Sequence, residues 1–177
     1  LHGKTLGIIG LGAIGSRVAK IAKEGFNMEV VAYDPYVADN KFSEMGVKKV
    51  GLDELPCIPE FVSIHAPLTK ETEKLLNANN LGKIKSGAII INTSRGAIID
   101  EKALAESIQK GRISGAALDV MQLEPPKMDN PLLRLNNVIL TPHIAAYTYE
   151  SLKKMDDSLI DDILRFAKGK PLLRLIS

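Results

Sequence analysis

The sequence contains almost nothing that could cross-link the chain or insert it into a membrane. Cys57 is the only cysteine among 177 residues, which excludes an internal disulfide bond and a cysteine-based zinc site. It lies between Pro56 and Pro59 with no cation or base beside it, so we interpret it as a structural thiol in a reducing compartment. Apolar runs such as Ala88–Ile91 have the length of a strand and are far too short to span a bilayer.

An excess of charge is also missing. The formal net charge is +2, and the lysines and arginines are spread along the chain. We therefore expect no binding to nucleic acid or to an anionic membrane. The first residues, Leu1–Thr5, show no signal-peptide pattern. With 45% hydrophobic residues, the composition is typical of a globular protein, and we expect a soluble cytoplasmic one.

Short apolar runs alternate with longer amphipathic stretches along the chain. Strands are expected at Thr5–Ile9, Glu29–Tyr33, Val47–Val50, Phe61–His65, Ala88–Asn92, Gly115–Val120 and Val138–Leu140. Helices are expected at Ala13–Lys23, Asn40–Met45, Leu75–Ile84 and Tyr149–Ala167, and from the cap Asp100 to about Lys110, while the prolines make Asp53–Glu60 irregular. This order predicts an α/β fold, a Rossmann-type doubly wound parallel sheet with helices on both faces. Such sheets bind ligands at the carboxyl ends of their strands.

A glycine motif follows the first expected strand. Gly10-Leu11-Gly12-Ala13-Ile14-Gly15 fits the pattern G-x-G-x-x-G, and it opens the first expected helix, which is the context that a dinucleotide site requires. Gly10 permits a tight turn, Gly12 lets the backbone approach a pyrophosphate, and Gly15 lets the helix pack closely on the strand. The positive end of the helix faces the phosphate charge.

An acidic residue completes this pattern. Asp34 ends the second expected strand, about 20 residues beyond Gly15, where a carboxylate accepts hydrogen bonds from the adenosine ribose. Pro35 and Tyr36 follow it, and no arginine is present to receive a 2′-phosphate, so the pattern favours NAD over NADP. The alternative is a glycine turn that serves packing alone, with Asp34 as a solvated strand end. The full order of strand, glycines, helix, strand and acid favours the cofactor site.

Four further motifs stand in a fixed order, together with the segment Ser63–Thr69 before them. They are Asn92-Thr93-Ser94-Arg95-Gly96, Ala117-Leu118-Asp119-Val120, Glu124-Pro125 and Thr141-Pro142-His143-Ile144. This series resembles the signature of the D-isomer-specific 2-hydroxyacid dehydrogenases, in their NAD-binding domain. The resemblance extends from about Leu1 to Pro171.

The resemblance implies three catalytic residues. Arg95 would bind the substrate carboxylate and polarise the 2-oxo group, because a planar guanidinium matches a carboxylate with two hydrogen bonds. His143 would be the acid and base, and Glu124 would orient and tune it. Taken singly, Glu124 could be an ordinary surface acid and His143 a histidine at a helix entry.

The resemblance also implies which residues hold the cofactor. Asp119 would hold the nicotinamide carboxamide. Besides the three glycines and Asp34, the other cofactor positions are Ala13, Ile14, Pro35, Ala66, Pro67, Thr72, Thr93 and His143. No residue role points to a metal. His65 also ends a strand, and we interpret it as structural or near the cofactor.

Full-length members of the family contain a second domain that supplies much of the substrate pocket. We therefore interpret residues 1–177 as a single NAD(P)-binding domain, with 168–177 as the start of a linker to a substrate domain. Such a chain should bind NAD(H) and turn over poorly by itself. The resemblance also implies a homodimer and a small 2-hydroxy or 2-oxo acid substrate of lactate, glycerate, phosphoglycerate or glyoxylate type.

Other functions share parts of this pattern. The C-terminal-binding corepressors share the fold and the three catalytic residues but act mainly as NADH-dependent assembly scaffolds, so an NADH-sensing interaction module is the alternative. Formate dehydrogenases place glutamine where Glu124 stands, and adenosylhomocysteine hydrolases lack the Arg-Glu-His order. The pattern as a whole favours an NAD-dependent oxidoreductase that acts on a CH–OH group.

Overall fold

The computed structural model describes residues 1–173, which form two compact units, one from Leu1 to Pro142 and one that begins at His143. The first unit is built on a seven-stranded parallel sheet with the order β3-β2-β1-β4-β5-β6-β7. Its strands are β1 (Thr5–Ile9), β2 (Glu29–Tyr33), β3 (Lys48–Lys49), β4 (Phe61–Ile64), β5 (Ala88–Asn92), β6 (Ile113–Leu118) and β7 (Val138–Leu140). The chain moves outward in one direction from β1 to β3 and in the other direction from β4 to β7.

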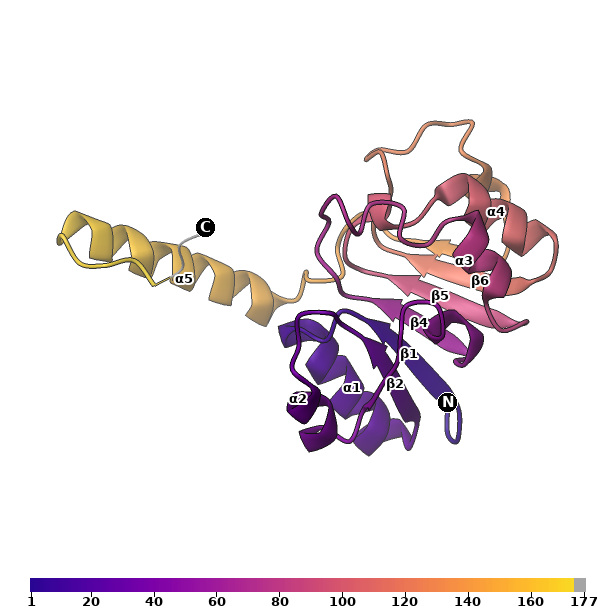
Figure 1. Cartoon of the computed structure of the whole chain (residues 1–177). Helices are drawn as coiled ribbons and strands as arrows, with labels where there is room; N and C mark the ends of the chain where they lie inside the picture. The colour runs from indigo at the N-terminus through magenta and orange to yellow at the C-terminus, as the bar shows by residue number, and fades with distance from the viewer. Residues whose placement is uncertain (174–177) are drawn as a thin grey trace. The chain divides into compact units, whose positions relative to one another are not determined.

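The helices of the first unit lie on both faces of this sheet (Figure 1). They are α1 (Ala13–Phe26), α2 (Asp39–Glu44), α3 (Ala78–Lys83) and α4 (Glu101–Gln109), with the 3-10 turns η1 (Leu55–Cys57), η2 (Gly96–Ile98) and η3 (Pro131–Arg134). α1 and α2 pack against β1 and β2, whereas α3 and α4 pack against β4, β5 and β6. The prediction of a Rossmann-type doubly wound parallel sheet is therefore confirmed.

The alternation of side chains along each strand separates two cores. On β2, Val30 and Ala32 pack under α1 and α2, while Val31 belongs to the core under α3 and α4. On β5, Ile90 is buried under α3 and α4, but Ile89 and Ile91 on the opposite face are only half-buried. Within this unit, the α1 face of the sheet is thus well covered over β1 and β2 and less covered over β5.

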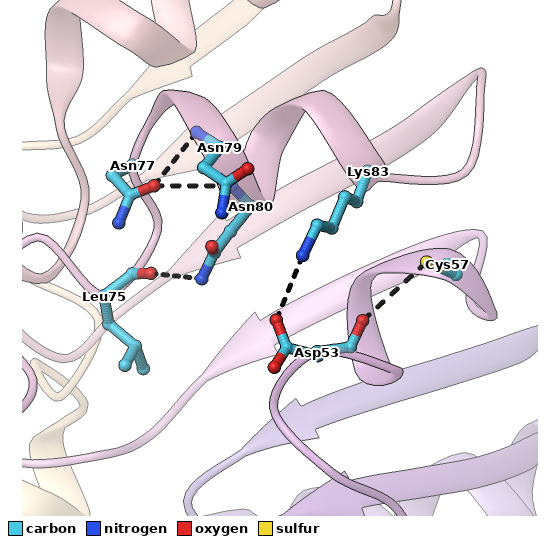
Figure 2. Close-up of polar contacts among 7 residues, drawn as sticks. All are labelled: Asp53, Cys57, Leu75, Asn77, Asn79, Asn80 and Lys83. Carbon is cyan, nitrogen blue, oxygen red and sulfur yellow. Dashed lines mark hydrogen bonds and ion pairs between the residues drawn. The ribbon is translucent and has the colours of Figure 1, made fainter.

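The expected helix at Leu75–Ile84 is shorter in the structure, because its first turn is replaced by a cap. Asn77 accepts hydrogen bonds from the backbone N–H groups of Asn79 (3.0 Å) and Asn80 (3.3 Å), so α3 begins only at Ala78 (Figure 2). The Asn80 side-chain amide donates to the carbonyl oxygen of Leu75 at 2.7 Å. The prediction missed that asparagine favours a cap over a helix interior.

Other expected boundaries also moved. The sixth strand begins at Ile113 and ends at Leu118, two residues earlier than Gly115–Val120 at each end. Its start is set by the fully buried Ile113, which pairs with Ala88, and its ladder with β7 ends at Leu118. α1 continues beyond Lys23 to Phe26, and Asn27 in the left-handed conformation ends it.

The irregular segment Asp53–Glu60 contains only the short turn η1, as its two prolines predict. Cys57 lies in this turn and is exposed. Its thiol lies 3.9 Å from the carbonyl oxygen of Asp53, whose carboxylate pairs with Lys83 of α3 at 3.1 Å (Figure 2).

The second unit contains α5 (Tyr149–Ala167), whose bounds match the prediction. The Thr148 hydroxyl accepts the N–H of Ser151 and caps its start, and Gly169 in the left-handed conformation follows its end. The chain then folds back, so that Arg165 donates to the carbonyl oxygen of Pro171 at 2.8 Å. Of the predicted linker, residues 174–177 lie outside the described residues. No helix among residues 1–173 is long and apolar enough to cross a membrane.

Glu60 joins the starts of two central strands. Its carboxylate accepts hydrogen bonds from the Lys85 ammonium at 2.5 Å and from the backbone N–H of Thr5, the first residue of β1, at 2.8 Å. The Lys85 hydrogen bond and then the Thr5 N–H lower the pKa of Glu60 from 4.5 to about 2. The ionised carboxylate therefore stabilises the folded chain.

We expect Glu60→Gln to lower the free energy of unfolding at about pH 7 by about 1 kcal/mol, because two donors lose a charged acceptor. The pKa of Glu60 is lower in the folded chain, so its contribution is complete above about pH 4.5 and declines as the pH falls toward about 2. Urea unfolding over this range should show the stabilities of variant and wild type converging. Glu24→Gln, which removes a surface carboxylate 3.9 Å from Lys20, is the control. A difference that stays constant with pH would contradict the assignment.

Candidate functional site

The predicted site residues of the first unit follow different strands and gather at one edge of the sheet. Gly10 follows β1, Asp34 follows β2, Ala66 lies just beyond β4, Thr93 follows β5, and Asp119 follows β6. All seven strands are parallel, so their carboxyl ends share this edge. This is the edge at which doubly wound sheets bind ligands.

The three glycines of the turn have different structural duties. Gly10 has a φ of +92°, and a Cβ placed on it would lie 2.6 Å from the backbone nitrogen of Ala66. A Cβ on Gly15 would lie 2.0 Å from the carbonyl oxygen of Gly10. A Cβ on Gly12 would meet no atom within 4 Å. Gly10 and Gly15 are therefore required by packing, whereas Gly12 keeps open space in front of the turn.

This open space lies at the start of α1. Gly12 is the N-cap of the helix and offers no side chain to its first turn, where Ala13 and Ile14 are exposed. The first N–H groups of a helix have no acceptor within it and carry its positive dipole end. The turn therefore fits an anionic group such as a pyrophosphate.

Asp34 is tied to this turn from the neighbouring strand. One oxygen of its carboxylate accepts the N–H of Leu11 at 2.8 Å, and the other accepts the N–H of Tyr36 at 2.9 Å. The residue is 9% exposed. Two backbone donors thus hold a carboxylate at the turn, in the place predicted for recognition of the adenosine ribose.

A pocket opens beside Asp34. It is lined by Ile9, Gly10, Tyr33, Asp34, Pro35, Tyr36, Ala66, Pro67, Thr69, Glu71, Thr72 and Leu75. Six of these are predicted cofactor residues: Gly10, Asp34, Pro35, Ala66, Pro67 and Thr72. The Thr72 hydroxyl closes the loop by donating to the carbonyl oxygen of Pro67 at 2.7 Å and accepting the N–H of Thr69 at 2.7 Å. A mainly apolar pocket with a carboxylate beside a glycine turn fits the adenosine half of NAD.

Six lining residues were not predicted as cofactor residues: Ile9, Tyr33, Tyr36, Thr69, Glu71 and Leu75. Their position in the sequence offered a signal, because each stands within a few residues of a predicted cofactor residue. A strand end that contacts a ligand generally brings its following loop with it.

Arg95 stands in a turn that a buried amide shapes. The Asn92 side chain is fully buried, accepts the N–H of Ser94 at 2.9 Å and donates to the carbonyl oxygen of Arg95 at 2.9 Å. The Ser94 hydroxyl donates to the carbonyl oxygen of Ala66, so this turn is also joined to the loop after β4 that lines the pocket beside Asp34. The Arg95 side chain is exposed. Asn92 and Ser94 were not predicted as site residues, although asparagine at a strand end is typical of such turns.

Glu124 lies in the loop after β6, and that loop contacts the Arg95 turn. Its carboxylate accepts the N–H of Met121 at 3.0 Å. A Cβ placed on Gly96 would lie 2.0 Å from the carbonyl carbon of Met121, so the two backbones touch where Gly96 has no side chain. The structure therefore brings the loops of two predicted catalytic residues into direct contact.

Asp119 and Thr141 join the ends of β6 and β7. Asp119 is 5% exposed, and its carboxylate accepts the Thr141 hydroxyl at 2.5 Å. Its N–H donates to the carbonyl oxygen of Asn92 at 2.9 Å. A buried carboxylate is thus held at the same edge, and Thr93, which follows the paired strand β5, is exposed. Its role toward a nicotinamide stays a prediction.

The structure describes two histidines of interest in different units. His143 is the first residue of the second unit and has a left-handed φ of 57°, so its position relative to Arg95 and Glu124 stays a prediction. His65 lies just beyond β4, and its Nε2 lies 2.9 Å from the Ser63 hydroxyl. Burial lowers the pKa of His65, which fits a neutral structural imidazole.

Among the described residues, no group of three or more histidine, cysteine or carboxylate side chains could hold a metal ion.

Comparison with known proteins identifies a family. Residues 1–145 match the family described as D-isomer specific 2-hydroxyacid dehydrogenase, NAD binding domain. The whole chain is 45% identical to D-3-phosphoglycerate dehydrogenase of Archaeoglobus fulgidus, over 33% of that protein's length.

Solved structures agree with this match. Apo D-mandelate dehydrogenase of Rhodotorula graminis superposes with a TM-score of 0.91 at 34% identity, over 99% of this chain and 52% of that one. D-lactate dehydrogenase of Lactobacillus jensenii with NAD+ gives a TM-score of 0.88 at 32% identity, over 98% of this chain and 56% of that one. The chain thus spans between a third and just over half of these relatives.

The different duties of the glycines can be tested in a pair of variants. Gly12→Ala should leave the melting temperature within about 2 °C of the wild type, because its methyl group meets no atom. It should weaken NADH binding at least about tenfold, because the methyl group takes the space of the pyrophosphate. Gly15→Ala should instead lower stability by about 2 kcal/mol. Thermal unfolding and a titration followed by nicotinamide fluorescence measure both effects. Wild-type NADH affinity in Gly12→Ala would contradict the proposed path of the cofactor.

Proposed function

This chain belongs to the D-isomer specific 2-hydroxyacid dehydrogenase family, and we propose that it holds NAD(H) and supplies Arg95, Glu124 and His143 to oxidise a small 2-hydroxy acid or reduce its 2-oxo partner. The chain is the NAD-binding domain of that family. The observation that carries the proposal is the shared edge of the sheet. There the pocket beside Asp34 and the touching loops of Arg95 and Glu124 are parts of one packed unit.

The residues present fit NAD. The N-terminal turn of α1, kept open by Gly12, would receive the pyrophosphate, and Asp34 would accept the ribose hydroxyls. When bound, NAD supplies a nicotinamide that takes up or gives hydride at C4. The same carboxylate would repel a 2′-phosphate, so NAD is favoured over NADP.

Arg95 is the group suited to bind the substrate. Its exposed guanidinium follows a turn whose backbone is held by Asn92, so it can pair with the carboxylate of a 2-oxo acid and polarise the adjacent oxo group. In oxidation His143 would take the hydroxyl proton as hydride leaves C2, and in reduction it would return that proton. Glu124 would orient the imidazole and stabilise its protonated form.

The substrate class follows from this chemistry. The relatives bear the names of enzymes for phosphoglycerate, mandelate and lactate, which share a carboxylate next to the carbon that carries the hydroxyl or oxo group. A guanidinium and an acid–base pair recognise that common part, so we propose a small 2-hydroxy or 2-oxo acid.

Assembly and location belong to the same proposal. We propose a cytoplasmic homodimer. An apolar groove on the α1 face of the sheet supports self-association, because side chains there, including Ile21, Phe26 and Ile91, are exposed or half-buried within the first unit.

Cofactor selectivity is the first test. The purified chain should bind NADH saturably and at least about tenfold more tightly than NADPH, and Asp34→Ala should weaken NADH binding by about tenfold. Asp53→Ala, which removes a surface carboxylate paired with Lys83, should leave NADH affinity unchanged. Nicotinamide fluorescence measures all three. If the folded chain bound neither nucleotide, the glycine turn would serve packing alone and the proposed cofactor site would be wrong.

Turnover is the second test. Because the chain spans only a third to about half of its relatives, we expect it to bind NADH but to reduce pyruvate or glyoxylate slowly or not at all. Hydride transfer requires a closed cleft that positions substrate and excludes water. The measurement is NADH oxidation at saturating 2-oxo acid, with His143→Gln as background. Turnover above about 10 per second, typical of complete enzymes, would overturn this expectation.

A further inference from the structure

The loop that carries Glu124 is fastened at both of its ends by one side chain. Glu101, the first residue of α4, is half-buried. One oxygen of its carboxylate accepts the backbone N–H of Gln122 at 2.5 Å, and the other accepts the side-chain amide of Asn130 at 2.6 Å. The segment between these two contacts contains no helix or strand. Its closure therefore depends on a residue more than twenty positions earlier in the chain.

Gln122 connects the Glu101 contact to the residues around Glu124 and Arg95. Its side-chain amide donates to the carbonyl oxygen of Ile99 at 2.7 Å, which gives the start of the loop a second tie to the same region. The preceding N–H, that of Met121, donates to the Glu124 carboxylate at 3.0 Å. The same two backbone units, at Met121 and Gln122, touch Gly96 beside Arg95. A displacement of Gln122 would therefore disturb the donor that orients Glu124.

We propose that Glu101 is a positioning residue that holds the Glu124 carboxylate in place by closing the loop between Gln122 and Asn130. The proposal rests on the proposed function, in which Glu124 tunes His143. Without the Glu101 carboxylate, the Gln122 N–H and the Asn130 amide lose their acceptor and donate to water instead. The loop then loses its closure and Glu124 becomes less ordered.

A simpler role for Glu101 is that of an acidic residue in the first turn of α4, where its negative charge interacts favourably with the positive end of the helix dipole. That role would affect α4 and its stability, but it would not depend on Asn130. The two roles can be separated by exchanging donor and acceptor. In Glu101→Gln the side-chain oxygen can still accept the Gln122 N–H. The new NH2 group, however, faces the NH2 group of Asn130, and two donors cannot form a hydrogen bond. Adding Asn130→Asp restores a hydrogen bond between the two side chains, in which residue 101 now donates and residue 130 accepts. The other carboxylate oxygen of residue 130 can still accept the backbone N–H of Leu132, as the Asn130 side chain does at 3.0 Å.

The first measurement is amide hydrogen exchange by NMR on the full 177-residue chain. Glu101→Gln should raise the exchange rate of the Met121 amide by about tenfold and leave that of Ile90, in the core of β5, unchanged. Glu101→Gln with Asn130→Asp should return Met121 to the wild-type rate. Glu106→Gln, which removes a carboxylate of α4 that pairs with Lys110 at 3.5 Å, should change neither amide.

The second measurement is the pKa of His143, followed by NMR in the same variants. In the proposed function the Glu124 carboxylate stabilises the protonated form of His143, so Glu124→Gln should lower this pKa. Glu101→Gln should lower it in the same direction but by less, and the double variant should restore it. No shift in Glu124→Gln would overturn the tuning role of Glu124, while exchange at Met121 would still decide whether Glu101 holds the loop.

Three results would overturn the positioning role of Glu101. The first is an unchanged Met121 exchange rate in Glu101→Gln. The second is an equal rise at Met121 and Ile90, which would indicate a general loss of stability. The third is a failure of Asn130→Asp to restore the rate in the double variant, provided that the variant keeps the wild-type exchange of Ile90.

Discussion

The site exists because backbones at the carboxyl edge of the sheet touch where side chains are missing. Gly10 lies against Ala66, Gly15 lies against Gly10, and Gly96 lies against Met121, each closer than a Cβ would allow. The first contact brings the turn after β1 to the loop after β4, and both line the pocket beside Asp34; the second packs the start of α1 on that turn. The third joins the Arg95 turn to the Glu124 loop. Close packing of loops from different strands is the condition on which the rest of the site depends.

Once the loops meet, single polar side chains hold them in place. Asn92 shapes the Arg95 turn, Asp119 joins the ends of β6 and β7, and Glu101 closes the Glu124 loop. Each of these polar groups is buried or half-buried, where leaving a donor or acceptor without a partner costs about 1–3 kcal/mol. Such contacts favour one arrangement of each loop. Two of the three side chains proposed for chemistry, Arg95 and Glu124, are exposed at the ends of these supports.

The sheet was predicted well from the sequence, since buried parallel strands show as short apolar runs. Four strands have the predicted bounds, namely Thr5–Ile9, Glu29–Tyr33, Ala88–Asn92 and Val138–Leu140. Two of the boundary errors fell where a polar residue or a strand partner decided the boundary. Asn77 delayed α3 by capping it, and the pairing of Ile113 with Ala88 moved the start of β6. Neither effect is visible in hydrophobic periodicity, because both depend on contacts made after the elements form.

The sequence by itself determined the element order, the glycine turn, Asp34 and the motif series that marks the family. These are local patterns, in which neighbouring residues carry the whole signal. Only the tertiary structure decided that Asp34 accepts the N–H of Leu11 and that Glu101 closes the loop from Gln122. These pairs are separated by 23 and 21 residues, and no local pattern specifies them. They arise when parallel strands bring their carboxyl ends together and place distant loops within hydrogen-bonding distance.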